Sequence, residues 1–265
     1  MIKTPLRATP LIHLIVILGF GGVSPIMSWA QSTNTTGSPL KFEEPKFLTA
    51  AIYQADRKEL QFRFTRQATR SGSTVNVLRE YTYPNGTVAV REKVVYQGDD
   101  LVSFTLEELQ TGGSGSAKIA GKPSAGNISF KYTKETGAKE KSHTEELRPD
   151  TIQPDMLAPF LVSHWDRLMK GEAVKCRYIV VPRRETVGFS FSKTSETTSG
   201  GKPVVVIKME PSSPIISALV GPLFFTMEKG GQHHVLEYTG RCAPKIRDGK
   251  NWKDLDAVTV FDWSR

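Results

Sequence analysis

Apolar and polar residues alternate in short segments from Phe47 to the end of the chain, and this pattern limits the possible folds more than any other feature. Residues 60–65 (LQFRFT) and 127–132 (NISFKY) are two clear cases. A period of two places successive side chains on opposite faces of a strand, so each segment predicts a strand with one buried face. Turns that contain glycine separate many of the segments, which favours an antiparallel meander.

The clearest turn is residues 83–87 (YPNGT). Asn85-Gly86 between two strand segments is typical of a two-residue type I′ hairpin, because both of its central positions need a positive φ. The segments with strand character are 60–65, 75–81, 88–96, 101–109, 128–132, 174–181, 186–193, 202–209, 223–228, 233–238 and 257–261.

Two segments have helical rather than strand character. Residues 154–170 carry apolar side chains at helical spacing, with Gly171 at the expected C-cap, and residues 214–220 form a second apolar segment. Residues 111–126 predict a flexible connection, and residues 134–146 a solvated loop or hairpin end. The predicted fold class is mainly β (α+β): a curved antiparallel sheet or half-barrel of about eleven strands with one or two helices.

The first thirty residues contain the three regions of a secretory signal. Lys3 and Arg7 give a positive start, residues 11–20 (LIHLIVILGF) are largely apolar, and residues 28–30 (SWA) supply a cleavage site. The alternative is a membrane anchor, but a single span needs about 20 apolar residues. We expect a signal peptide at 1–30 cut after Ala30, a flexible leader at 31–46 and a single β-rich domain at 47–265. The mature chain is then soluble, without a transmembrane span, and periplasmic or secreted.

The charge of the chain indicates the kind of surface it meets. Its net charge is +8, and removal of the two cations of the signal peptide lowers this to +6 (8 − 2). A moderately basic protein outside the cytoplasm more plausibly meets an anionic membrane surface or polymer than nucleic acid. No helix-turn-helix, zinc finger or aromatic–basic repeat supports nucleic-acid binding.

Cys176 and Cys242 are the two cysteines of the chain. Oxidising conditions outside the cytoplasm favour a disulfide between them, with one possible connectivity. The alternative is two separate buried thiols that pack as small apolar side chains.

No segment carries a recognisable catalytic motif. Residues 115–123 (GSAKIAGKP) differ from a phosphate-binding loop, because five residues instead of four separate the glycines and Pro123 replaces the required Ser or Thr. His233 and His234 are adjacent, so in a strand they point to opposite faces and do not readily chelate one metal. We therefore expect no enzyme activity, no cofactor and no metal.

Three short segments resemble known proteins: residues 165–168 (WDRL), 209–213 (MEPSS) and 252–257 (WKDLDA). Through them the chain resembles a large group of uncharacterised exported bacterial proteins with a domain of unknown function, over roughly residues 47–265. This resemblance implies export and no named activity. The expected architecture is also similar to the LolA-like half-barrel of periplasmic lipoprotein carriers, in which a curved sheet holds an apolar groove closed by helices.

A curved sheet that does not close leaves an apolar concave face, which helices or a ligand must fill. The candidate apolar lining is Phe160, Leu161, Trp165, Ile215, Ile216, Leu219 and Phe225, and the candidates for an anionic head group are Arg177, Arg183 and Arg184. Each of these side chains also suits an ordinary core or surface position. The favoured function is non-enzymatic binding or carriage of an acyl-chain or lipid-like ligand in the bacterial periplasm. The alternatives are a structural or interaction protein of the cell envelope, with a filled core, and an unrecognised envelope hydrolase.

Overall fold

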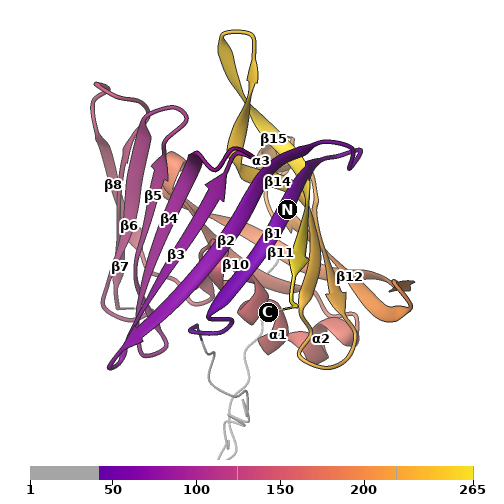
Figure 1. Ribbon diagram of the computed structural model, residues 1–265. Helices are drawn as coiled ribbons and strands as arrows, with labels where there is room; N and C mark the ends of the chain where they lie inside the picture. Colours follow the sequence, from indigo (N-terminus) through magenta and orange to yellow (C-terminus); the bar gives the residue numbers. More distant parts are fainter. Residues whose placement is uncertain (1–41, 124, 219, 265) are drawn as a thin grey trace, which may run out of the picture. The chain divides into compact units, whose positions relative to one another are not determined.

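Fifteen strands form one curved sheet within the residues that the computed structural model describes, which are 42–123, 125–218 and 220–264 (Figure 1). The first eight are β1 (Phe47–Gln54), β2 (Leu60–Ser71), β3 (Thr74–Thr82), β4 (Val88–Gln97), β5 (Asp100–Glu108), β6 (Gly113–Ala120), β7 (Asn127–Thr133) and β8 (Lys141–Glu146). The others are β9 (Thr151–Ile152), β10 (Val174–Val180), β11 (Glu185–Ser199), β12 (Lys202–Pro211), β13 (Leu223–Glu228), β14 (Val235–Asp248) and β15 (Asn251–Asp262).

The strand order is that of two meanders, and pairing of the first strand with the last strand joins them. Strands β1 to β8 follow one another to one edge and β15 to β9 follow to the other edge, and β1 pairs with β15 between them. Each pairing is antiparallel except that of β9 with β10, which is parallel. The fold is therefore mainly β, as the alternation predicted, with more strands than the eleven expected.

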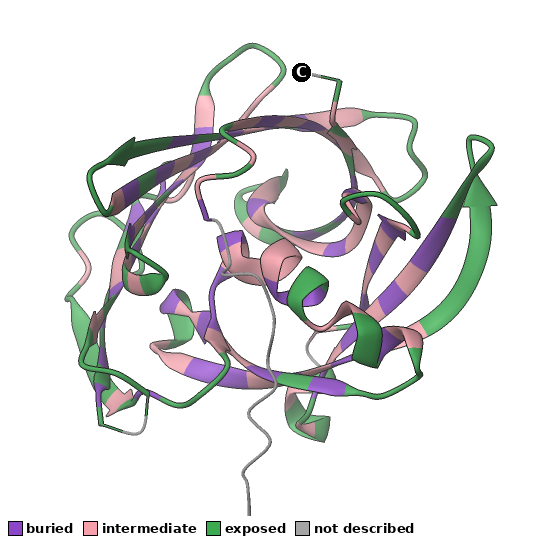
Figure 2. Ribbon diagram, turned by 90° about the horizontal axis from the view of Figure 1, so that it is seen from below, coloured by how far each residue is buried: buried purple, intermediate pink, exposed green. Residues whose placement is uncertain are grey.

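Helical segments are few and short in the described part of the chain. They are η1 (Pro154–Met156), α1 (Leu157–Ser163), α2 (Trp165–Met169), η2 (Val181–Arg183) and α3 (Pro214–Ser217). Figure 2, which is turned by 90° from the view of Figure 1, shows α1 and α2 inside the curve of the strands. The predicted helix at 154–170 is thus broken into three pieces, and the predicted helix at 214–220 is a single turn.

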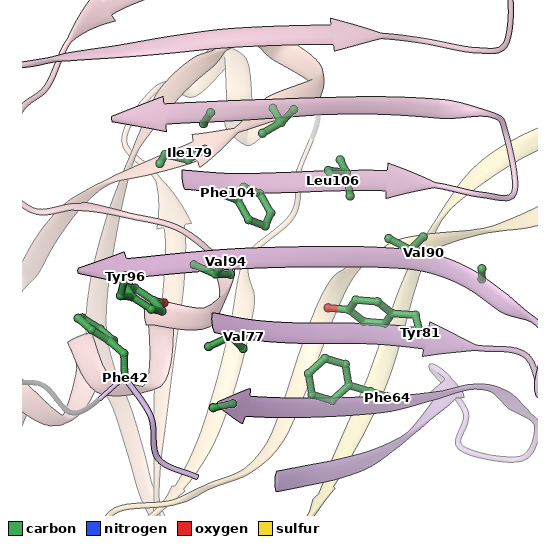
Figure 3. Close-up of a cluster of buried hydrophobic side chains, with 14 of the residues drawn as sticks. Phe42, Phe64, Val77, Tyr81, Val90, Val94, Tyr96, Phe104, Leu106 and Ile179 are labelled. Atoms are coloured by element: carbon green, nitrogen blue, oxygen red, sulfur yellow. The ribbon is translucent and has the colours of Figure 1, made fainter. Parts of the chain in front are cut away.

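Strand β10, next to the β9 edge of the sheet, contributes side chains to two apolar cores. Ile179 of β10 and Val181 of η2 belong to a first core with inward side chains of β1–β7, and Figure 3 shows Ile179 among Phe104 and other side chains of this core. Val174 and Cys176 of the same strand belong to a second core, which contains α1, α2 and β11–β14 residues. Strand β10 therefore packs apolar side chains on both faces.

The predicted flexible connection at 111–126 is wrong, because half of it, residues 113–120, is strand β6. A Cβ on Gly115 would lie 2.5 Å from the carbonyl oxygen of Lys131 and 2.6 Å from Cγ1 of Val181. Glycine is needed here so that β7 and η2 can approach the backbone of β6 closely. Strands β1 and β9 were not predicted as separate segments. Residues 141–146, predicted as part of a hairpin end or loop, form edge strand β8, which pairs with β7 in a hairpin.

The hairpin at residues 83–87 is present, but its turn type differs from the prediction. Gly86 has a φ of 89°, whereas Asn85 is not among the residues with positive φ, so the turn is not type I′. The amide of Gly86 donates to the carbonyl oxygen of Tyr83 at 2.9 Å. Pro84 fixes its own φ near −65°, which suits the second position of a type I turn and shifts the turn by one residue.

The end of the predicted leader is packed against the sheet. Phe42 is only 2% exposed and its ring stacks on Tyr96 with 4.2 Å between ring centroids. The predicted signal peptide and residues 31–41 of the leader lie outside the described residues.

Candidate functional site

Most of the predicted apolar ligand residues come together in the second core. Phe160, Leu161 and Phe225 are buried there, and Trp165 and Ile216 pack against it at partial exposure. Ile215 is 76% exposed and lies outside this core. Leu219 is not among the described residues.

Aromatic side chains connect α1 to the strands of the second core. The ring centroid of Phe160 is 5.6 Å from that of Phe191, and Phe191 is 6.3 Å from Phe225. Phe225 is in turn 5.1 Å from Tyr238 on β14. Helix α2 is held at its own end by Trp165, whose ring stacks on His233 with 3.9 Å between centroids. The helices therefore occupy the concave side of β11–β14 with their own side chains.

The three predicted head-group arginines lie on β10 and at the end of η2. Arg177 is half-buried and donates to the hydroxyl and carbonyl oxygens of Thr186. Arg183 is exposed and pairs with Glu185, and Arg184 follows η2 with a φ of 58°. The head-group role of these three arginines therefore stays a prediction from the sequence.

A different row of charged residues crosses the concave face of the sheet. Arg66 on β2 lies directly opposite Arg79 on β3, and Arg79 lies opposite Glu92 on β4. All three are at least nine-tenths buried. Two like charges opposite each other on a sheet repel, and buried charges require partners. The row therefore needs additional negative charge close to its two arginines.

Asp155 of η1 supplies this negative charge. Arg66 donates from Nε to Oδ1 at 2.7 Å and from Nη2 to Oδ2 at 3.0 Å. The hydroxyl of Tyr96 donates to Oδ2 at 3.0 Å, and Gln153 donates from Nε2 to the same hydroxyl oxygen at 2.6 Å. Nε of Arg79 is 3.8 Å from Oδ1. A two-pronged contact with arginine is the strong form of a carboxylate interaction, so it fixes η1 to the sheet.

The far end of the row is less completely paired. Nη1 of Arg79 is 2.7 Å from Oε2 of Glu92 without hydrogen-bond alignment, and both atoms lack a hydrogen-bond partner in the described structure. Nε of Arg79 lacks one as well. Burial raises the pKa of Glu92 against the lowering effect of Arg79. Burial alone lowers the pKa of Arg79, but Glu92 and its other neighbours raise it above the ordinary value, so the guanidinium keeps its charge.

This charged row was not predicted, although its signal is present in the sequence. Arg66 continues the inward series that Phe62 and Phe64 begin, and Arg79 continues that of Val75 and Val77. A charged residue at an inward position of an alternating segment indicates a buried polar site, because exposed charges belong on the other face.

Two hollows lie at other places on the sheet. One of about 400 Å³ is lined by residues of β1, β2 and β15, including Ala51, Arg63 and Val260. The other, of about 190 Å³, lies near Gly221, Phe224 and Gly240. Neither is lined by a residue of η1, α1 or α2.

The predicted disulfide is absent from the structure, where Cys176 and Cys242 are free thiols. Cys176 lies in the second core, whereas Cys242 packs against the first. In sheet order, β11, β12 and β13 separate their strands. A disulfide requires Cα atoms within about 7 Å. An even number of cysteines in a sequence does not show that the fold brings them this close.

Both thiols are expected to be unreactive in the folded protein. Burial raises the pKa of Cys176 to about 12, and burial likewise raises that of Cys242 to about 12. Because the thiolate is the reactive form, Ellman's reagent at pH 8 should react slowly with native protein. Both thiols should react promptly after unfolding in guanidinium without reductant. Unfolded, unreduced protein with no reactive thiol would show that the cysteines are bonded instead.

Comparisons with known proteins identify no family. No family model matches the chain, and no curated protein matches it. Among solved structures, one match is described as a beta-barrel-like protein of domain of unknown function DUF1849 from Brucella abortus. Its sequence identity is 8% and its TM-score 0.39, over 82% of this chain and 94% of that one. Another match is a putative outer membrane lipoprotein-sorting protein domain from Vibrio parahaemolyticus, at 9% identity and a TM-score of 0.24, over 83% of this chain and 82% of that one.

Helices long and apolar enough to cross a bilayer are not found among the described residues. Grouped His, Cys, Asp and Glu side chains suited to a metal ion are likewise not found in this part of the chain.

Proposed function

We propose that this is a non-catalytic exported protein that binds an apolar, acyl-chain-like molecule on the concave side of its sheet. The ligand lies against β11–β14, in the space that α1 and α2 occupy in the described structure. Binding therefore requires residues 153–170 to move away from the sheet. The export and the periplasmic location are part of the proposal, and they derive from the secretory pattern of residues 1–30.

The observation that carries the proposal is the way this concave face is covered. Its strands have 6 to 15 residues and are paired with one another. The cover consists of helices of three, seven and five residues that break at His164. Short helices have little stability of their own and depend on packing. An acyl chain offers the same kind of apolar surface as Phe160 and Leu161, at about 25 cal/mol per Å² buried. Replacing these short helices by a ligand therefore costs less free energy than displacing a strand would.

The alternative is a structural or interaction protein of the cell envelope with no small-molecule ligand. Leu161, Leu168 and Phe191 are completely buried, so the concave side is filled when the helices are in place. A filled core is the expectation for a protein of this second kind. The two proposals differ in whether the cover leaves the sheet.

Binding of decanol tests the proposal. Full-length mature protein should bind decanol, and the melting temperature should rise with decanol concentration because a ligand of the folded state stabilises it. Amide hydrogen exchange should show faster exchange of residues 157–169 with decanol bound, since the helices lose their packing. Native mass spectrometry of protein purified from its own envelope should also detect a bound lipid.

A protein without a ligand gives the opposite results. Unchanged melting temperature, unchanged exchange in α1 and α2, and no co-purifying lipid would favour the structural alternative. Ile215→Ala serves as the matched control, because Ile215 is predicted from sequence as a ligand residue but is exposed outside the core. This variant should bind decanol as the unmodified protein does.

A further inference from the structure

The carboxylate of Asp155 sits in a site that the sheet alone provides. Arg66, Arg79 and Tyr96 come from the adjacent strands β2, β3 and β4, whereas Asp155 comes from η1 in the helical cover. The three sheet residues are at least nine-tenths buried. The carboxylate can therefore leave with the cover, while its donors remain fixed on the strands.

These three sheet residues offer more hydrogen-bond donors than the Asp155 carboxylate uses. Arg66 and the hydroxyl of Tyr96 hold both carboxylate oxygens at 2.7–3.0 Å. Nε and Nη1 of Arg79 are buried donors without a hydrogen-bond partner in the described structure. Unpaired buried donors are rare, and each needs an explanation. A ligand carboxylate that is not tied to η1 could shift toward Arg79 and use them.

The charge of the row selects the kind of head group. Two arginines face Glu92 and Asp155, so the charges sum to zero while Asp155 is bound. A ligand with one negative charge restores this balance after Asp155 leaves, whereas an alcohol leaves one buried cation unpaired. A phosphate dianion would add a second negative charge beside Glu92. Buried unpaired charge is costly, so the row favours a monoanion.

The order of residues along the cover matches the order of groups in a fatty acid. Asp155 is followed by Leu157, Phe160 and Leu161, which pack on the second core. The cover thus presents a carboxylate at one end and a run of apolar groups after it. A linear amphiphile with a terminal carboxylate can follow the same path.

We propose that Arg66, Arg79 and Tyr96 form the head-group site for a fatty-acid carboxylate, and that Asp155 occupies this site as an internal substitute when no ligand is bound. The inference rests on the proposed function, because the acyl chain takes the place of α1 side chains. It adds the ligand class and the residues that select it.

Paired ligands of equal chain length test the inference. At pH 7.5, decanoate should bind the full mature protein at least about tenfold more tightly than decanol, as a charge-assisted hydrogen bond implies. In the double variant Arg66→Met/Asp155→Leu this ratio should fall to about one. Arg70→Met, which changes an exposed arginine on the same strand, should keep the ratio of the unmodified protein.

Chemical rescue gives an independent readout. Asp155→Ala empties the site, so acetate should raise the melting temperature of this variant. The same acetate concentration should leave the unmodified protein and the double variant unchanged. A purely structural role of Asp155 does not predict rescue by a small carboxylate.

The outcomes separate the two proposals. Equal binding of decanoate and decanol, or a ratio that survives the double substitution, would overturn the head-group site and leave the apolar binder intact. Tighter binding of decyl phosphate than of decanoate would overturn the choice of a monoanion. No binding of decanol or decanoate would overturn the proposed function and the head-group site together.

Discussion

Replacement of Arg66 by methionine is expected to lower the free energy of unfolding by about 3–5 kcal/mol, the usual cost of breaking a buried ion pair from one side. The side chains of Arg66 and Asp155 are 6% and 2% exposed. Methionine keeps much of the volume but leaves the Asp155 carboxylate with Tyr96 as its remaining close donor. It also removes the hydrogen bonds from Arg66 to the carbonyl oxygens of Phe42 and Pro45. Urea unfolding followed by tryptophan fluorescence measures the loss.

Arg70→Met is the matched control on the same strand. Arg70 pairs with Glu43 at 43% side-chain exposure, and exposed pairs contribute at most about 1 kcal/mol. The double variant Arg66→Met/Asp155→Leu should recover most of the stability, because apolar residues can replace a buried pair at little cost. A loss below about 1 kcal/mol for Arg66→Met would mean that η1 is not held by this ion pair.

The sequence predicted the parts of the fold that have a local signal. Strands β2, β3, β4 and β5 each alternate clearly, and tight turns join them, so their antiparallel order followed from the sequence. Pairing across the ends of the chain, as between β1 and β15, has no local signal. Strand β1 (FLTAAIYQ) contains small apolar residues at outward and inward positions alike, which weakens its alternation.

Strand β6 shows why composition alone misled the prediction. Its sequence GSGSAKIA is typical of a flexible linker. In the fold, Gly115 is present because Lys131 and Val181 approach within the space of a Cβ atom. In a single sequence, a glycine that close packing requires cannot be distinguished from a glycine in a flexible linker.

Burial of the candidate apolar residues could be predicted from the sequence, but their role in binding could not. Phe160, Leu161 and Phe225 are buried in the second core, because apolar periodicity reports burial. Arg177, Arg183 and Arg184 were chosen for their charge near an apolar segment, and their role as head-group residues stays a prediction. Register would have identified the buried row: pairing of Ser71 with Thr74 at the β2–β3 turn also pairs Arg66 with Arg79.

Phe191→Ala is the second substitution with a large expected effect, a loss of about 3–5 kcal/mol in the free energy of unfolding. Phe191 is completely buried in the second core, between Phe160 of α1 and Phe225 of β13. Truncation removes the contacts of a whole ring and leaves a cavity that the continuous strands around it cannot close. Guanidinium unfolding measures the loss, and Ile215→Ala, at a site that is 76% exposed, should change stability by less than about 0.5 kcal/mol.

The Phe191→Ala variant also distinguishes helices α1 and α2 that are fixed in the core from helices that a ligand can displace. An apolar cavity in a protein interior stays dry and takes up small apolar molecules, so decanol should stabilise Phe191→Ala more than it stabilises the unmodified protein. A loss of stability below about 1 kcal/mol would mean that Phe191 is loosely packed and that space for an acyl chain exists before α1 moves. A large loss without any stabilisation by decanol would mean that the second core serves the fold alone.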